Sequence, residues 1–398
     1  MPVEISDWND LQNVDNDLTG DYVLVNDLDE NTEGYSGTGD DFDPIGFIEG
    51  ERFTSEFTGS FDGDGFVIED LVIETADAGD IALIASTDSG ATIENLSVSG
   101  SVTNTGNGEF CFSGLVGNIQ GGIVKNCVSH VDVTSDGDQV GCLAGNNNTG
   151  TIENCYSSGS VDGADTVGGL VGQTGSEIST SYAVGSVSGT NEVGGLIGST
   201  FDDPTIIDSY WDTEATGQST SAGGTGLTTS EMQGSEAETN MTGFDFTDIW
   251  DTVLESDDDA DRDGYPILLS INRESQLTAQ GIVEPFALSV QTNRADLVSA
   301  TSATLNGEIT ELEDGESADV FFEYGTNVED NETTKTTLSD TVAFDETVEN
   351  LPDTVIEFRA LAEGEVDGET FTETGQTLTF ETFKKWKGLI DGTELKTF

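Results

Sequence analysis

The chain has 398 residues, of which 78 are Asp or Glu and 11 are Lys or Arg, so its formal net charge at pH 7 is −67. Self-repulsion at such a charge opposes compaction in dilute salt, whereas at molar salt the screening length falls to about 3 Å. Phosphate would be repelled, so nucleic acid is not expected as a partner. The acids are dispersed among β-branched and aromatic residues, which favours a folded protein of a hypersaline setting over a disordered acidic chain.

The first residues, MPVEISDWNDLQNV, contain no basic segment followed by an apolar core, so they do not match a secretory signal. The sequence also contains no run of roughly 18 apolar residues that could span a membrane. We therefore expect a protein that stays inside the cell or leaves it by another route, such as inside a virus particle.

Short glycine-rich segments recur along the middle of the chain. They end at Gly117, Gly145, Gly172 and Gly198, with spacings of 26 to 28 residues. Similar ten-residue segments alternate with them and begin at Ile93, Val124, Ile152 and Ile178. The stretches between glycines are too short for helices and rich in β-branched residues, which indicates short strands. A repeat of this length predicts the coils of a parallel β-solenoid.

Equivalent residues of successive coils would stack about 4.8 Å apart. Columns of Ile and Val would then form a narrow core. The third position of the ten-residue segment repeats Asn and the fifth repeats Tyr, which predicts an amide ladder and an aromatic column. The predicted structural ladder consists of Asn95, Asn126, Asn154, Tyr156, Tyr182 and Tyr210. The glycines would sit where the coil turns, with positive φ or close to the neighbouring coil.

The segments GLVG, GGLVG and GGLIG, alternating with TIENCYSSGSV, resemble the GLUG-motif repeats of bacterial and archaeal surface proteins. The resemblance extends upstream through FTGSFDGDGFVIEDLVI and downstream through SYWDTEATGQSTSAGGTGLTTSEM and DGYPIL. It implies a right-handed parallel β-helix with capping coils over residues 1–80, repeat coils over 81–215 and a C-terminal cap over 216–280. It implies no activity, because such repeats occur mainly as scaffolds and adhesive stalks.

An Asp-rich segment, DDDADRDGYP, lies in the predicted C-terminal cap. Asp259, Asp261 and Asp263, followed by Gly264, match the start of a calcium loop, although Ser270 stands where an EF-hand places Glu. Two interpretations remain: a minimal loop for Ca²⁺ or another cation, and an acidic loop that closes the solenoid. No other cofactor is expected.

The four cysteines and the single histidine show no zinc-binding spacing. Cys127 and Cys155 occupy the same position of consecutive segments. This placement indicates a buried thiol column or, if the two coils pinch together, a disulfide.

Parallel β-helices can also hold carboxylate pairs that cleave polysaccharides. Among 78 acids no pair can be selected, and basic residues that would bind an acidic sugar are few. His130 is aligned with glycines of the other repeats, namely Gly100, Gly159 and Gly185, so we expect an outward-facing side chain. An enzyme is not the favoured interpretation.

Near residue 281 the glycine repeat stops and segments with the spacing of sandwich strands follow. The series SATLNGEI, VFFEYG, LPDTVIEFRALAE and LTFET resembles fibronectin type III and related Ig-like domains over residues 286–383. The resemblance implies an antiparallel β-sandwich with Tyr324 and Phe358 in its core, used as a spacer or docking module. The predicted fold class is therefore all-β, a solenoid followed by a sandwich.

The last segment, residues 384–398, concentrates positive charge on an otherwise acidic chain. A solvated tail and an anchor are both compatible with it. We favour an anchor, because apolar residues accompany the lysines. The predicted anchoring residues are Lys384, Lys385, Trp386, Lys387 and Phe398.

These features lead to three hypotheses about function. The first is a non-enzymatic virion structural protein of a halophilic archaeal virus, a capsid turret, decoration protein or tail fibre that contributes to host attachment. Its partners would be other virion proteins, bound through the C-terminal domain and tail, a host glycan or surface-layer protein, and further copies of the chain. The alternatives are a haloarchaeal cell-surface adhesin or surface-layer accessory protein and, second, a polysaccharide-active β-helix enzyme.

Overall fold

The computed structural model describes residues 1–47, 55–106, 110–254, 262–282, 288–299, 301–312, 317–328, 330–339, 341–352, 354–366 and 369–382. The chain divides into two compact units, Met1–Val283 and Glu284–Phe398. The first is a parallel β-solenoid and the second consists of antiparallel sheets, so the predicted all-β fold class is confirmed. No helix in the described part of the chain has the length and apolarity needed to cross a membrane.

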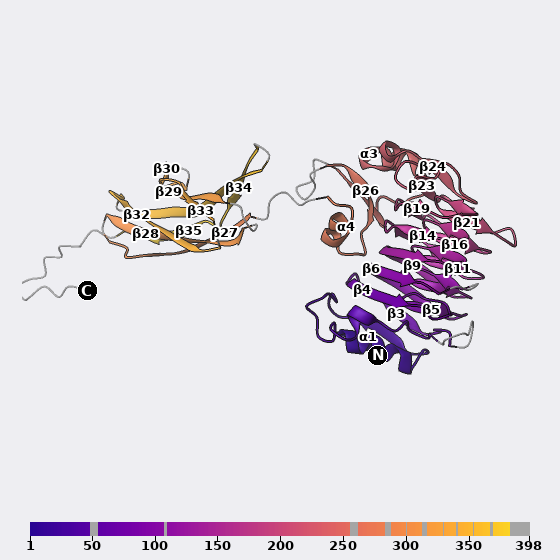
Figure 1. Ribbon diagram of the computed structural model, residues 1–398. Coiled ribbons are helices and arrows are strands. Elements are labelled where there is room, and N and C mark those ends of the chain that lie inside the picture. The colour runs from indigo at the N-terminus through magenta and orange to yellow at the C-terminus, as the bar shows by residue number, and fades with distance from the viewer. Residues whose placement is uncertain are drawn as a thin grey trace, which may run out of the picture. The chain divides into compact units, whose positions relative to one another are not determined.

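The solenoid coils form three parallel sheets that run side by side along the stack (Figure 1). The largest sheet contains β1 (Val3–Ile5), β2 (Asp21–Leu24), β3 (Ser60–Asp62), β4 (Val67–Thr75), β6 (Thr92–Asn104), β9 (Ile123–Ser135), β12 (Thr151–Glu153), β13 (Tyr156–Ser157), β14 (Val161–Gly163), β17 (Glu177–Ser179), β18 (Tyr182–Ala183), β19 (Val187–Ser188), β22 (Ile206–Ile207), β23 (Tyr210–Asp212) and β24 (Thr225–Leu227).

The two smaller sheets carry the glycine-rich segments. One contains β5 (Ile84–Thr87), β8 (Val116–Ile119), β11 (Ala144–Asn147), β16 (Val171–Thr174) and β21 (Ile197–Thr200). The other contains β7 (Cys111–Phe112), β10 (Gln139–Gly141), β15 (Thr166–Gly168) and β20 (Val193–Gly194). At the N-terminal end, the chain also forms α1 (Trp8–Gln12) and the 3₁₀ turns η1 (Asn13–Asn16) and η2 (Gly39–Asp41).

Apolar columns fill the interior of the solenoid, as the repeat predicts. One column consists of Ile93, Val124, Ile152 and Ile178, which pair in register and are at most 1% exposed. Parallel pairing places equivalent side chains on the same face, so one Ile or Val per coil suffices to continue the core.

The repeated glycines serve close packing and not a left-handed backbone. Gly172 has no positive φ, but a Cβ on it would lie 2.6 Å from the carbonyl oxygen of Gly145 and 2.6 Å from the nitrogen of Val140. At the third position of the ten-residue segment, φ is positive: 52° at Asn95, 50° at Asn126 and 51° at Asn154, and 43° at Thr180 of the next coil. Asn tolerates this conformation better than other residues with a Cβ, which explains its recurrence at the corner of the coil.

The alignment of His130 with glycines is wrong by one residue. In the structure His130 pairs with Ser99, and Gly100 pairs with Val131. His130 therefore lies in a row with Ser99 and Ser158, on the outer face of the largest sheet.

The segment after the last coil covers two surfaces of the solenoid. Residues near Ser221 first close its end, where the Ser221 hydroxyl accepts hydrogen bonds from the backbone nitrogens of Leu196 and Ile197. Residues 228–254 and 262–282, named here the strap, then return along the outer face of the largest sheet (Figure 1). The strap contains α2 (Thr229–Met232), α3 (Gly234–Asn240), β25 (Trp250–Val253), β26 (Gly264–Leu268) and α4 (Arg273–Ala279).

The second unit has two antiparallel sheets with an apolar core between them. One sheet contains β27 (Leu288–Asp296), β28 (Ser302–Leu312) and β32 (Ala343–Glu349). The other contains β29 (Ala318–Gly325), β30 (Asn331–Glu332), β31 (Thr336–Leu338), β33 (Val355–Val366), β34 (Glu369–Thr374) and β35 (Leu378–Glu381). Phe358 is 1% exposed in this core, whereas the paired Tyr324 is only partly buried at its edge.

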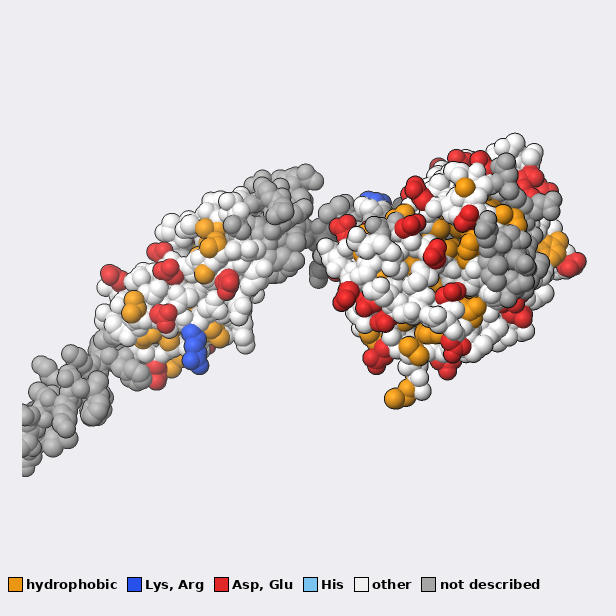
Figure 2. Space-filling model, turned by 60° about the horizontal axis from the view of Figure 1, so that its bottom comes forward, with side chains coloured by type: hydrophobic (Ala, Val, Ile, Leu, Met, Phe, Trp, Pro, Cys, Tyr) orange, Lys and Arg blue, Asp and Glu red, His pale blue; other side chains and the backbone are white. Residues whose placement is uncertain are grey.

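Acidic side chains are spread over the visible surface of both units, with few basic ones among them (Figure 2). Ion pairs in the described residues include Lys125 with Glu94, at 2.9 Å, and Arg359 with Glu323, at 2.7 Å. Such pairs neutralise a small part of a −67 charge, so most of the self-repulsion is left for salt to screen.

Candidate functional site

The tyrosine column lies on the outer face of the solenoid, under the strap. The rings of Tyr156 and Tyr182 stack with centroids 4.8 Å apart and an interplanar angle of 2°. Tyr156 donates a hydrogen bond to Oε1 of Gln276, and Tyr182 donates one to the carbonyl oxygen of Pro266. Burial raises the pKa of both hydroxyls, so they remain protonated donors at neutral pH. The column therefore fixes the strap to the coils.

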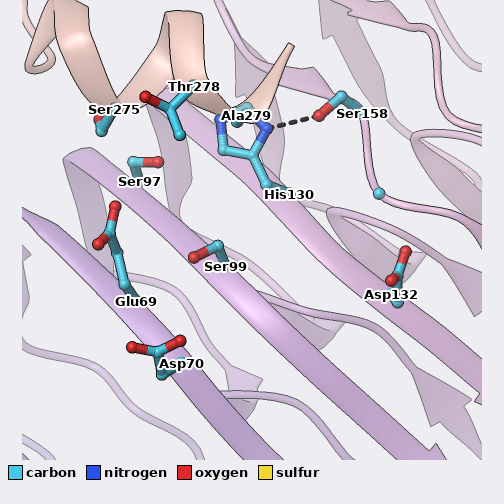
Figure 3. Close-up of a pocket in the computed structure, with 11 residues that line it drawn as sticks. Glu69, Asp70, Ser97, Ser99, His130, Asp132, Ser158, Ser275, Thr278 and Ala279 are labelled. Atoms are coloured by element: carbon cyan, nitrogen blue, oxygen red, sulfur yellow. Dashed lines mark hydrogen bonds between the residues drawn. The ribbon is translucent and has the colours of Figure 1, made fainter. Parts of the chain in front are cut away.

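A cleft of about 440 Å³ opens beside this column, between α4 of the strap and the outer faces of β4, β6 and β9. Figure 3 shows α4 crossing above the strands, with Ser99 on the sheet beneath it. Glu69 and Asp70 lie on one side of Ser99, and His130 and Asp132 lie on the other. Beside the aromatic column, α4 thus crosses strands whose outward side chains are polar.

Most residues that line the cleft carry a polar side chain. Hydroxyl groups are present on both walls, from the strands and from α4: Ser97, Ser99, Ser158, Ser275 and Thr278. The carboxylates of Glu69, Asp70 and Asp132 complete it, and no Lys or Arg is among the lining residues. The cleft thus offers hydrogen-bond donors and acceptors together with negative charge.

His130 lies at the wall nearest the aromatic column. Its Nδ1 is 2.5 Å from Oγ of Ser158, and its ring meets the edge of Tyr156 at 5.5 Å between centroids. The other ring nitrogen, Nε2, is buried without a hydrogen-bond partner in the structure. Burial lowers the pKa of His130 to about 4, so the imidazole is neutral at neutral pH.

Negative charge accumulates at the opposite wall. The pKa of Glu69 is raised, first by its burial and then by the neighbouring carboxylates of Asp70, Asp27, Asp29 and Glu274. Glu274 belongs to α4, so both walls contribute to this repulsion. Anions are therefore disfavoured in the cleft.

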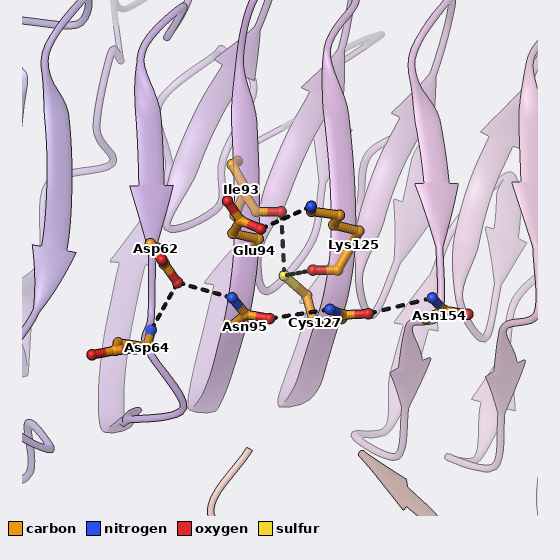
Figure 4. Close-up of polar contacts among 9 residues, drawn as sticks. Asp62, Asp64, Ile93, Glu94, Asn95, Lys125, Cys127 and Asn154 are labelled. Carbon is orange, nitrogen blue, oxygen red and sulfur yellow. Dashed lines mark hydrogen bonds and ion pairs between the residues drawn. The ribbon is translucent and has the colours of Figure 1, made fainter. Parts of the chain in front are cut away.

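The predicted asparagines form a hydrogen-bonded row at the corner of the coils (Figure 4). Nδ2 of Asn126 donates to Oδ1 of Asn95 at 3.1 Å, and Nδ2 of Asn154 donates to Oδ1 of Asn126 at 3.4 Å. Asn95 in turn donates to the carboxylate of Asp62 at 3.0 Å. The row therefore ends on a charged acceptor, which strengthens its last bond.

A second amide row on β8 and β11 was missed by the sequence interpretation. Asn146 donates to Oδ1 of Asn118 at 3.3 Å, and Asn118 donates to the carboxylate of Asp80 at 3.1 Å. A signal was present, because Asn118 and Asn146 both directly follow the last glycine of the repeated motif. The next coil has Gln173 at this position. The change of residue type concealed the shared register.

All four cysteines are free and buried. Cys127 and Cys155 lie in the interior, where their thiols donate to backbone carbonyl oxygens of their own segments, Lys125 and Glu153, at 3.2 Å. The structure thus has the thiol column and not the disulfide.

Several predicted site residues fall outside the described part of the chain. These are Asp259 and Asp261 of the calcium loop and Lys384, Lys385, Trp386, Lys387 and Phe398 of the tail. Asp263 is described, is exposed, and lies against Gly234 at the start of α3. Among the described residues, no three His, Cys, Asp or Glu side chains are grouped so that they could hold a metal ion.

No family model matches the chain. It is 28% identical to Halomucin of Haloquadratum walsbyi over 374 residues, which is 76% of this chain and 3% of Halomucin. It is 31% identical over 140 residues to a protein of Evansella cellulosilytica described as a Gly-rich membrane protein, which covers 35% of this chain and 13% of that protein. The chain thus spans a small part of the length of these relatives.

Among solved structures, the chain is similar to a protein of Bacteroides ovatus described as an immunoglobulin A1 protease. The TM-score is 0.47 and the identity 19%, over 68% of this chain and 93% of that chain. The sensor domain of an anti-sigma factor from Pseudobacteroides cellulosolvens is 20% identical over 24% of this chain and 93% of that domain, with a TM-score of 0.20.

The solenoid and the relative from a halophilic archaeon together fit a surface protein.

Proposed function

We propose that the chain is a non-enzymatic structural protein displayed on a surface in brine, where the solenoid is a rigid support. The observation on which this depends is the continuous stack of coils, with apolar columns inside and the strap bonded along the outside. Each coil contacts only its neighbours, so such a stack resists bending and presents an extended face. Its acidic exterior is stable where salt is concentrated.

The coils are proposed to be GLUG-type repeats. The motif glycines recur once per coil and lie where a side chain would collide with backbone, as at Gly145 and Gly172. The second unit is proposed to be a fibronectin type III-like module. Its strand orders, β27-β28-β32 in one sheet and β30-β29-β33-β34 in the other, with β31 also paired with β29, support this proposal, because such modules are sandwiches of two antiparallel sheets.

The location is proposed to be a virus particle, with the cell surface as the alternative. The virion hypothesis comes from the order of solenoid, sandwich and basic tail, and it assigns docking on the particle to the sandwich and tail. The relative in Haloquadratum walsbyi, a cellular organism, supports the alternative. Host glycans or surface-layer proteins are the proposed partners in both cases.

An enzyme is the second candidate, because His130 and Ser158 are within the distance of a base and its nucleophile. Two observations oppose it. Nε2 of His130 has no carboxylate partner to orient the ring, and burial depresses the pKa of His130 to about 4, below the range of an effective base at neutral pH.

Fractionation of a producing culture tests the location. An antibody against the chain would be applied to density-gradient fractions of particles, washed cell envelopes and cytosol. Co-sedimentation with particles supports the virion proposal, and recovery with envelopes supports the cell-surface alternative. Recovery only from the cytosol would contradict both. Turnover of a polysaccharide or ester panel by the purified chain, abolished in Ser158→Ala, would contradict the non-enzymatic assignment.

A further inference from the structure

The cleft beneath α4 has the size and the construction of a small-ligand site. Its volume of about 440 Å³ falls within the range of roughly 300–1,000 Å³ usual for such sites. One wall is a rigid sheet and the other is a short helix held by the bonded tyrosine column. The walls are therefore fixed before any ligand arrives, which lowers the entropic cost of binding.

The polar groups of the cleft suit a ligand rich in hydroxyl groups. The carboxylates of Glu69, Asp70 and Asp132 can accept hydrogen bonds from such a ligand. Serine hydroxyls on the strands, such as Ser99, and Thr278 on α4 can donate or accept from opposite sides. His130 also lines the cleft, although its Nε2 is buried and has no hydrogen-bond partner in the structure.

The charge of the cleft excludes two other classes of ligand. Anionic ligands would meet three carboxylates with no lining Lys or Arg and a neutral imidazole. A tightly bound metal ion is disfavoured because the described carboxylates are not grouped as metal ligands. Among ligands without negative charge, a neutral molecule with several hydroxyls matches the hydroxyl groups on both walls.

We propose that this cleft binds a single neutral sugar residue at the end of a surface glycan. This inference rests on the proposed surface function and specifies its ligand. The sugar would lie on the sheet over Ser99, donate to the carboxylates on either side, and contact Thr278 of α4.

The test uses the full chain in molar KCl with four neutral probes and one charged probe. The neutral probes are the methyl glycosides of glucose, galactose and mannose, and N-acetylglucosamine, and the charged probe is glucuronate. Calorimetry and saturation-transfer NMR should show saturable, millimolar binding of at least one neutral probe. Binding of glucuronate should be at least about tenfold weaker, from the repulsion by the lining carboxylates.

Two kinds of variant locate the binding. Ser99→Leu fills the floor of the cleft and should abolish binding. Its matched control is Ser179→Leu, which replaces a half-buried serine of β17, a strand that does not line the cleft, and should leave binding unchanged. If Ser99→Leu does not fold, Thr278→Val removes one hydroxyl at an exposed position of α4 and should weaken binding about tenfold.

The proposal is overturned if no neutral probe binds saturably, or if binding persists equally in Ser99→Leu or Thr278→Val. These outcomes leave the surface location intact, because culture fractionation and surface labelling measure it independently. Conversely, sugar binding by a chain found only in the cytosol would overturn the surface function and leave the site standing.

Discussion

Replacing Tyr182 with alanine should detach the strap from the solenoid while the coils stay folded. Tyr182 is 0% exposed. It stacks on Tyr156, lies with its ring centroid 5.7 Å from that of Trp250, and donates to the carbonyl oxygen of Pro266. Truncation of a buried aromatic side chain costs about 3–5 kcal/mol. Because the ring lies on the outer face of the sheet, the substitution should lower the free energy of the contact between strap and sheet rather than that of the coils.

Hydrogen exchange measured by mass spectrometry in molar KCl checks this prediction. A loss of about 3 kcal/mol in the opening free energy of the strap corresponds to roughly 100-fold faster exchange of its amides. Amides of β9 and β16, inside the stack, should change far less. Tyr182→Phe is the matched variant: it keeps the ring and leaves the Pro266 carbonyl without its donor, at a cost of about 1–3 kcal/mol.

The reasoning is refuted if Tyr182→Ala leaves strap exchange unchanged, because the ring would then not hold the strap. It is equally refuted if coil and strap amides accelerate together, since the strap would then be an inseparable part of the stack. Ile207→Ala, at a residue that is 44% exposed on β22, is the surface control and should alter stability by less than about 0.5 kcal/mol.

Three further predictions concern the ladder, the buried imidazole and the charge. In urea unfolding, Asn126→Ala should lower the free energy of unfolding more than Asn126→Gly. Both variants lose the amide, but Ala also incurs a backbone strain of about 1–2 kcal/mol at a φ of 50°. Equal losses in the two variants would contradict a left-handed backbone at this corner. Burial holds the pKa of His130 at about 4, against 6.5 in the unfolded chain. Between these two values the unfolded state binds more protons than the folded state. The free energy of unfolding therefore falls as the pH is lowered through this window, by up to about 3 kcal/mol. His130→Gln should flatten that part of the pH–stability curve, and an unchanged curve would show that other groups cause it. Lowering KCl from molar to about 0.1 M lengthens the screening distance from about 3 to 10 Å and should lower the thermal midpoint measured by circular dichroism; a midpoint independent of KCl would contradict a fold dependent on screening.

The parts of the fold that repeat were predictable from the sequence. Ile93, Val124, Ile152 and Ile178 recur at one position, and stacking of equivalent residues is a direct consequence of parallel pairing. The asparagine row follows from the same rule. The left-handed φ of Asn126 was not foreseen, although the preference of Asn for that conformation was available as a signal.

The cleft could not be predicted, because its two walls come from elements without a shared period. His130 and Ser99 lie on the coils, whereas Thr278 lies on α4 of the strap. The strap has no internal repeat, and nothing in its sequence indicates which face of the solenoid it covers. The repeated tyrosines contained a partial signal. Tyr156, Tyr182 and Tyr210 are all buried on one face, although only the rings of Tyr156 and Tyr182 stack. Buried phenols need partners for their hydroxyls. The misalignment of His130 with glycine then concealed its neighbour Ser99.

Surface labelling tests the central proposal most directly. Intact cells and intact particles from one producing culture would be treated with gold-labelled antibody against the solenoid, in molar salt, and imaged before and after lysis. The proposed function predicts label on the outside of unbroken particles or cells, with little gain after lysis. Label that appears only after lysis, in the cytosol, would contradict a surface structural role.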